Sequence, residues 1–305
     1  RQGSDTARAG DISLLSRTGM GSASAPLQVD SNALAFYNTT SGDVFIRSVG
    51  AAAQLELKAP PYEFGAPNHW QAGSVADSGR FYTSPYYYYQ PGGNSGGSVV
   101  LNYDTGQVNV NTAYSAANDL TLRAPSISVS GGDYGIPLSA GGTLTLEATS
   151  YGINSSYWAL QAPTVKLIAA DEVAWGGAIT AQNLYADGGA GRVLLDNSSN
   201  AIGTVAGRAG GNQSFRLSTA SNASVTIGTV NDVSGIRANG EFNTLSEINL
   251  SGINGLGVLS DIKAQSVTLT NTSTQNGVGV DGSVIEAGSV LIDSLSGIGV
   301  RNSAR

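Results

Sequence analysis

Pairs of apolar residues that flank a single intervening position recur along the chain. They are Val44/Ile46, Leu55/Leu57, Leu120/Leu122, Leu144/Leu146, Val165/Leu167, Val193/Leu195, Phe215/Leu217, Val225/Ile227, Ile248/Leu250, Val267/Leu269 and Val290/Ile292. The residue between the two members is usually small or polar, so each pair puts two apolar side chains on one face of a short β-strand. From Leu120 onward, most first members follow one another after 19 to 28 residues.

A short strand that returns every ~20–25 residues, with Gly, Asn and Ser between copies, is typical of a solenoid. Each copy is too short to bury its own apolar face and needs a neighbour above and below. The pattern therefore predicts an all-β chain coiled as a parallel β-helix, or β-solenoid, with on the order of 12–14 turns of ~22 residues. A long regular rod of this kind usually serves as a binding surface or a spacer.

The N-terminal part shows the same alternation at closer spacing. We expect strands at 11–16, 26–29, 33–37, 43–47, 53–58 and 98–103. Because these segments follow one another so closely, we interpret them as different faces of one or two turns rather than one face repeated.

Residues 60–97 interrupt the pattern. This segment holds five of the nine prolines, the only histidine and a run of four tyrosines. Proline cannot donate to a strand ladder and is confined to edges and loops. We therefore predict an excursion that leaves the β-helix and lies against its side, within a single domain that spans 1–305. Two irregular turns are the alternative.

The same segment supplies the candidate binding site. Aromatic rings give a large contact area at a low entropy cost, and they stack on sugars and on partner aromatic side chains. A regular shaft does not require such a cluster, although its rings would also serve to pack the excursion onto the rod. The candidate patch consists of Trp70, Phe81, Tyr82, Tyr86, Tyr87, Tyr88 and Tyr89.

Composition and charge narrow the function. The chain has 305 residues, of which 41% are hydrophobic and 12% charged, with a net charge of −7 and no cysteine. The acidic balance argues against nucleic acid as a partner, because such binding needs a clustered basic surface. No apolar run approaches the ~18–20 residues of a membrane span. The absence of a signal peptide and the Arg1 start lead us to expect a piece of a longer protein.

The sequence offers few residues that could act in catalysis or bind a metal ion. Any catalytic triad or histidine metal site would have to use His69, beside Trp70 in the excursion. A polysaccharide hydrolase or lyase is the serious enzymatic competitor, and its paired carboxylates would lie ~5–9.5 Å apart. Asp171 and Glu172 are adjacent, so a strand would point them in opposite directions, and we interpret them as a solvated turn. We expect no enzyme, cofactor or metal site.

Several segments resemble a known protein family. Asp11–Val29 is similar to a repeat unit of the filamentous-haemagglutinin-like exoproteins, the large secreted partners of bacterial two-partner secretion systems. Ala201–Gly207 and Ser224–Ile236 are similar to another repeat of those proteins, and Gly42–Ile46 and Gly141–Ala148 resemble its unit of a glycine followed by an alternating strand.

The resemblance implies a right-handed β-helix, export through an outer-membrane transporter, and a role in adhesion or aggregation. The expected function is thus the structural, adhesive shaft of a secreted bacterial surface protein, located outside the cell. Its expected partners are neighbouring copies or the rest of its own longer chain, host glycans or a cell-surface protein, and the transporter of the parent protein. A filament subunit that stacks end to end is the alternative, and a polysaccharide-active β-helix enzyme is the third hypothesis.

Overall fold

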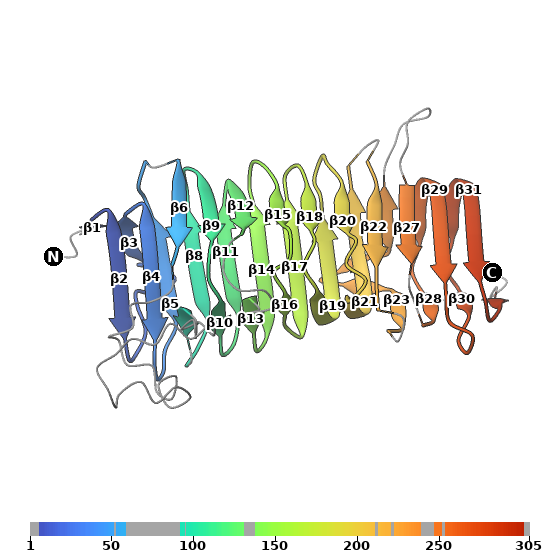
Figure 1. The fold of residues 1–305 in the computed structure, drawn as a ribbon, viewed down its shortest axis with the longest axis horizontal. Helices are drawn as coiled ribbons and strands as arrows, with labels where there is room; N and C mark the ends of the chain where they lie inside the picture. The colour runs from blue at the N-terminus through green and yellow to red at the C-terminus, as the bar shows by residue number, and fades with distance from the viewer. Residues whose placement is uncertain are drawn as a thin grey trace, which may run out of the picture.

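The computed structural model of the chain describes residues 6–51, 53–58, 92–94, 96–130, 138–210, 213–220, 223–238, 247–251 and 254–301. These residues form parallel strands that stack into a right-handed β-helix of about 11 turns, with the N-terminal strands at one end and the C-terminal strands at the other (Figure 1). This confirms the predicted fold class. Within the same ranges there is no helix long and apolar enough to cross a membrane.

The N-terminal part of the described residues has ten strands, and each of the six expected segments corresponds to one of them, with ends shifted by at most one residue. They are β1 (Ala7–Arg8), β2 (Asp11–Ser16), β3 (Leu27–Asp30), β4 (Ala33–Asn38), β5 (Val44–Ser48), β6 (Gln54–Leu57), β7 (Gly92–Asn94), β8 (Val99–Tyr103), β9 (Gln107–Val110) and β10 (Tyr114–Ala116). Strand β7 falls within the range 60–97 and belongs to the stack, because it pairs in parallel with β4 and β10.

The middle of the chain has the most regular turns, each with strands on three faces. They are β11 (Leu120–Ala124), β12 (Ser126–Val129), β13 (Leu138–Ala140), β14 (Thr143–Ala148), β15 (Ile153–Ser155), β16 (Leu160–Gln161), β17 (Thr164–Ala169), β18 (Val173–Trp175), β19 (Ile179–Asp187), β20 (Val193–Leu195), β21 (Ala201–Ala209) and β22 (Phe215–Ser218). Strand β19 is long enough to follow two faces, since its two ends pair with β16 and β17.

The C-terminal strands continue the stack beyond β22 and include one short hairpin, β24–β25. They are β23 (Val225–Ile227), β24 (Thr229–Val230), β25 (Val233–Ser234), β26 (Ile236–Ala238), β27 (Glu247–Ser251), β28 (Leu256–Val258), β29 (Ile262–Asn271), β30 (Val278–Asp281), β31 (Ile285–Ser294) and β32 (Ile298–Arg301).

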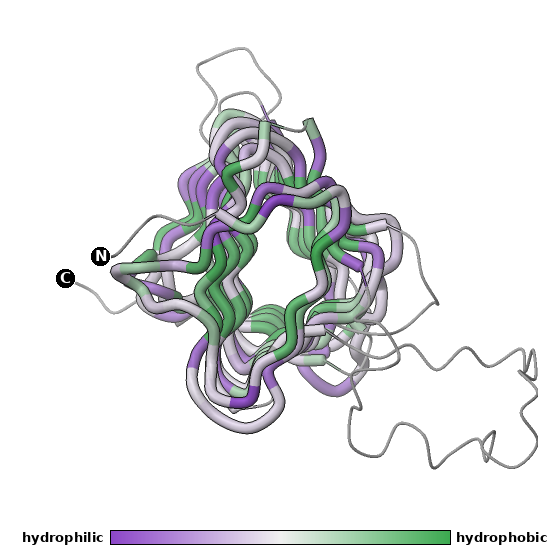
Figure 2. The backbone as a smooth tube through the Cα atoms, turned by 90° about the vertical axis from the view of Figure 1, so that its left-hand side faces the viewer, coloured by the Kyte–Doolittle hydropathy of each residue, from purple (hydrophilic) through white to green (hydrophobic). Residues whose placement is uncertain are grey.

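The register of the strands explains the apolar pairs. Leu120 of β11 pairs with Leu144 of β14, which pairs with Val165 of β17, and all three side chains are fully buried. The intervening Thr121 and Thr145 point outward in a parallel ladder. Figure 2 shows the result along the axis, with the hydrophobic residues gathered toward the inside of the coil. The alternation of period two therefore separates core from surface on each face.

The apolar pairs do not form one continuous column. Val165 pairs onward with Leu184 of β19, whereas Val193 of β20 pairs with Val173 of β18 on another face. The change of face coincides with the longest gap from Leu120 onward, the 28 residues between Val165 and Val193. Since every face uses the same spacing of i and i+2, the sequence pattern alone does not distinguish them.

Buried asparagines link successive turns at the corners of the coil. The side chain of Asn200 donates to the carbonyls of Leu195 and Ser218 and accepts from the backbone N–H of Ile179. The side chain of Asn38 accepts from the backbone N–H of Gly19 at 3.0 Å and donates to the carbonyl of Ser41 at 2.8 Å. These amides satisfy backbone groups that the strand ladders leave unpaired at the bends.

The number of turns, about 11, is lower than the 12–14 that we expected from a uniform length of ~22 residues. The connection between β6 and β7 alone takes residues 58–91, whereas the equivalent connection of the next turn, between β9 and β10, takes residues 111–113. The long connection between β6 and β7 therefore takes up residues that would otherwise form additional turns.

Candidate functional site

The long connection between β6 and β7 carries every residue of the predicted aromatic patch. Trp70, Phe81, Tyr82 and Tyr86–Tyr89 lie between residues 59 and 91, as does His69, and this segment is outside the described residues. Both points at which it joins the β-helix are described. We call these two residues the base of the 59–91 segment: Lys58, which directly follows β6, and Gly92, the first residue of β7.

Tyr114 holds the first of these points. Its side chain is fully buried, and its hydroxyl donates a hydrogen bond to the carbonyl of Lys58 at 2.8 Å and lies 3.4 Å from the carbonyl of Leu34. Its ring packs on Phe36, with ring centroids 4.9 Å apart. Burial raises the pKa of Tyr114 well above its usual range, so the hydroxyl stays a donor. The exit of the segment is thus tied to the apolar core.

The ring of Tyr114 also explains why glycine occupies position 92, at the other end of the segment. Gly92 pairs in register with Tyr114, and a Cβ atom on Gly92 would lie only 2.2 Å from the Cε1 atom of the ring. Only a residue without a side chain fits against the ring at that position. The next residue, Gly93, has φ +117°, a conformation that L side chains rarely adopt. Tyr114 therefore contacts the base at both ends: it bonds to Lys58 and leaves no room for a side chain at Gly92.

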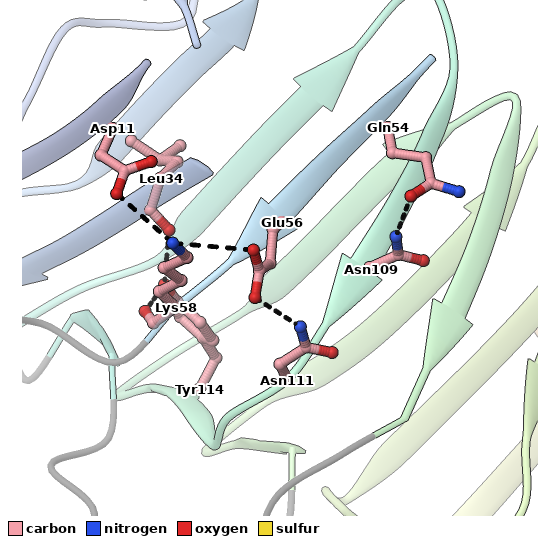
Figure 3. A network of polar contacts seen from close by, with 8 residues as sticks. All are labelled: Asp11, Leu34, Gln54, Glu56, Lys58, Asn109, Asn111 and Tyr114. Atoms are coloured by element: carbon pink, nitrogen blue, oxygen red, sulfur yellow. Dashed lines mark hydrogen bonds and ion pairs between the residues drawn. The ribbon is translucent and has the colours of Figure 1, made fainter. Parts of the chain in front are cut away.

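A network of polar side chains surrounds the base on the outer face of the β-helix (Figure 3). The Nζ atom of Lys58 lies 3.4 Å from a carboxylate oxygen of Asp11 and 3.7 Å from one of Glu56. Glu56 also accepts a hydrogen bond from Asn111 at 2.8 Å. These side chains are partly or largely exposed, so each ion pair adds little stability and the network chiefly sets the surface charge.

The last turn of the described residues forms a second candidate surface. Val267 is fully buried, but Val290, its register partner in β31, is 47% exposed. Likewise Val278 is 1% exposed, while Ile298, its partner in β32, is 51% exposed. Val290 and Ile298 therefore occupy inward positions, but they are exposed because no further turn of the described residues covers them. The large apolar side chains exposed on β31, β32 and their connections are Val284, Val290, Leu291, Leu295, Ile298 and Val300.

The hairpin β24–β25 covers a patch on the outside of the β-helix. Its turn residues, Asn231 and Asp232, have φ values of 53° and 62°, as expected for a two-residue hairpin loop with both central residues at positive φ. Val230 packs on Tyr185 and Ala206 in a small apolar cluster separate from the main core.

The carboxylate of Asp187, two residues after Tyr185 in β19, is buried. It accepts hydrogen bonds from the Tyr185 hydroxyl at 3.0 Å, from Nε of Arg208 at 2.8 Å and from the backbone N–H of Gly189 at 2.9 Å. Burial, followed by the charge of Asp187, raises the pKa of Tyr185 to about 12. The hydrogen bond to Asp187 likewise raises the pKa of Arg208. Both carboxylate oxygens are occupied, so this cluster has the character of a structural link between turns.

The acidic pair singled out in the sequence lies in a turn. Asp171 is exposed between β17 and β18, and Glu172 accepts a hydrogen bond from Nε of Arg192 at 2.9 Å on the next turn. Among the described residues, no group of three or more His, Asp or Glu side chains is placed to hold a metal ion.

Local sequence signals reveal only part of these surfaces. Asn231-Asp232 between two valines is a recognisable hairpin signal. No local signal marks Tyr114 or Gly92, because their roles depend on a contact between successive turns. Comparison with protein-family models, curated proteins and solved structures finds no match for this chain.

Proposed function

We propose that this chain is a shaft segment of a secreted bacterial surface exoprotein. In this role the stack of turns acts as a spacer, roughly 50 Å long for about 11 turns at a spacing of ~4.8 Å. The continuous ladder of parallel strands supports the proposal, because each turn contacts only its neighbours and a rod of this kind transmits position along its axis. The mechanism is mechanical and interfacial.

The observation that carries the proposal is the attachment of the 59–91 segment. A buried tyrosine, Tyr114, donates a hydrogen bond to Lys58, the residue before the segment, and pairs in register with Gly92, the residue after it. A surface protein that adheres through this segment needs such a base. We assign the adhesive contact to the patch containing Tyr86–Tyr89, with host glycans or a cell-surface protein as the partner.

The secreted location rests on the family resemblance of Asp11–Val29 and the related segments. The absence of cysteine is compatible with passage through an outer-membrane transporter as an unfolded chain. In this proposal the parent protein engages the transporter, and the β-helix forms outside the cell.

Adhesion of coated beads tests the proposal. Latex beads carrying the full chain are incubated with epithelial cells and compared with beads carrying a variant in which Tyr86–Tyr89 are replaced by serine. We expect the variant to lose most of the adhesion while its circular dichroism is unchanged. Equal adhesion of both bead types, or no adhesion above that of uncoated beads, would contradict the proposal.

A second candidate function is end-to-end assembly into a filament. It is favoured by the open apolar positions of the last turn, such as Val290 and Ile298, and by the unpaired edge of β31 and β32 within the described residues. Such an edge is a template for another strand. Sedimentation velocity of the wild type and an Ile298→Lys variant tests it: concentration-dependent growth that the substitution abolishes supports assembly, and a monomer at all concentrations refutes it.

We propose a non-enzymatic role. Asp171 lies in a turn, and the carboxylate of Glu172 forms an ion pair with Arg192. We therefore interpret these two residues as structural and not as the paired carboxylates of a hydrolase. Incubation of the full chain with pectin, alginate and chitin tests this, and the release of reducing or unsaturated sugar ends would overturn it.

A further inference from the structure

One corner of the β-helix is notched because its connections differ in length. The connection from β8 to β9 spans residues 104–106, the one from β11 to β12 is Pro125 alone, and the one from β14 to β15 spans residues 149–152. The short Pro125 turn therefore lies recessed between two longer ones. This corner is distinct from the one that carries the 59–91 segment, which leaves the coil between β6 and β7.

The recess is a small open cavity with an uncharged lining. Its volume is about 380 Å³, near the lower end of the range typical of ligand pockets. Its lining residues are Ala53, Thr105, Gly106, Gln107, Pro125, Ser126 and Tyr151. The lining combines the rings of Pro125 and Tyr151 with the hydroxyls of Thr105 and Ser126 and the amide of Gln107. None of the seven lining residues carries a charge, which favours a neutral ligand.

The side chain of Tyr151 forms one wall of the notch. It is 64% exposed, so its ring contributes little to the core. Its backbone is nevertheless firmly placed, since the N–H groups of Tyr151 and Ser150 both donate to the carbonyl of Pro125, at 2.9 and 3.1 Å. The Ser126 hydroxyl lies 3.3 Å from the carbonyl of Gly152 and adds a further link between the two turns. The backbone that carries the exposed ring is thus pre-positioned, which lowers the ordering cost of binding.

We propose that this notch binds a neutral hexose unit of an oligosaccharide or polysaccharide. A hexose offers an apolar face of C–H groups that stacks on the Tyr151 ring, and hydroxyls that donate to the oxygens of Thr105, Ser126 and Gln107. These oxygens serve as acceptors, because the two hydroxyl protons and one amide N–H of Gln107 are already donated to Gly50, Gly152 and Asn109. The inference deepens the proposed function, on which its biological meaning rests, by adding a saccharide contact on the shaft itself. The contact is separate from the aromatic patch of the 59–91 segment.

Saturation-transfer NMR with the full chain tests the proposal. The probes are maltohexaose, cellohexaose and chitohexaose as neutral ligands, with sialyllactose and oligogalacturonate as acidic comparators. We expect at least one neutral probe to bind with millimolar affinity, and more tightly than either acidic probe. In Tyr151→Ala, that affinity should fall by at least about tenfold.

Tyr157→Ala is the matched control. Tyr157 is also half-exposed, but it lies in the connection between β15 and β16 and does not line the notch. Its substitution should leave saccharide binding unchanged, and Gln107→Ala should weaken it. Circular dichroism verifies that each variant folds.

Three outcomes overturn the proposal: no neutral probe binds at about 10 mM, Tyr151→Ala binds as tightly as the wild type, or Tyr157→Ala is equally impaired. Because the Tyr151→Ala comparison leaves residues 59–91 unchanged in both proteins, its failure is distinguishable from failure of the bead-adhesion test. Loss of adhesion upon replacement of Tyr86–Tyr89 would stand even if Tyr151 bound no sugar.

Discussion

The hydroxyl of Tyr114 donates a hydrogen bond to the carbonyl of Lys58, 2.8 Å away, although 56 residues separate the two in sequence. Lys58 is the last described residue before the 59–91 segment, and Tyr114 lies in the β10 strand of the next turn. One buried hydrogen bond thus joins the core of the shaft to the start of the segment that we propose to be adhesive.

Tyr114→Phe is expected to lower the free energy of unfolding by about 1–2 kcal/mol, because the substitution removes a buried donor while keeping the ring. Urea denaturation followed by circular dichroism measures the change. Tyr151→Phe, at an exposed tyrosine, is the control and should alter stability by less than about 0.5 kcal/mol. Equal effects of the two substitutions would show that the bond to Lys58 is unimportant.

Gly92→Ala should be destabilising by about 1–3 kcal/mol, because the new methyl group would overlap the Tyr114 ring and force β7 or the ring to move. Gly10→Ala provides the comparison, since a Cβ atom there meets no atom within 4 Å. Thermal unfolding of both variants checks the prediction. It fails if Gly92→Ala is as stable as Gly10→Ala.

The pH dependence of stability should report on Tyr185. Its pKa in the folded chain is about 12, above the ~10 of an unfolded chain, so the folded state keeps a proton that the unfolded state loses. The resulting stabilisation is fully present below a pH of about 10 and is lost as the pH rises toward 12.

Tyr185→Phe should therefore show a smaller fall in its urea midpoint between pH values of about 9 and 11.5 than the wild type. The decline should persist in part, since burial also raises the pKa of Tyr114. An unchanged decline in the variant would mean that Tyr185 ionises equally easily in the folded and unfolded chains.

Val267 and Val290 are register partners, but we expect them to contribute unequally to stability because the last turn is exposed. Val267→Ala should cost about 2 kcal/mol or more, because Val267 is fully buried, whereas Val290→Ala at its 47% exposed partner should cost well under half as much. Chemical denaturation at low protein concentration compares the two. A similar cost at both positions would indicate that the last turn is covered in solution.

The sequence predicts the strands well and their stacking less well. Alternation of apolar and polar residues is a local property, so segments such as 11–16 and 33–37 could be located from the chain alone. The assignment of strands to faces depends on the length of each connection, which is why the series from Val165 to Val193 concealed a change of face. The binding patch formed by Trp70, Phe81, Tyr82 and Tyr86–Tyr89 stays a prediction, since these residues lie outside the described ranges.

Contacts between turns were the least accessible to sequence reasoning. The pairing of Gly92 with Tyr114 joins residues from successive turns, and neither residue type is diagnostic by itself. Similarly, Tyr185, Asp187 and Arg208 come together only because β19 and β21 stack in register. The hairpin at Asn231-Asp232 was not predicted either, although its turn signal is local.

Negative-stain electron microscopy of the purified chain over a roughly hundredfold concentration range tests the central claim, that this protein is a shaft. We predict separate short rods, roughly 50 Å long, at every concentration. Compact round particles would contradict the β-helical rod. Fibres of uniform width that lengthen with concentration would contradict the shaft in favour of end-to-end assembly.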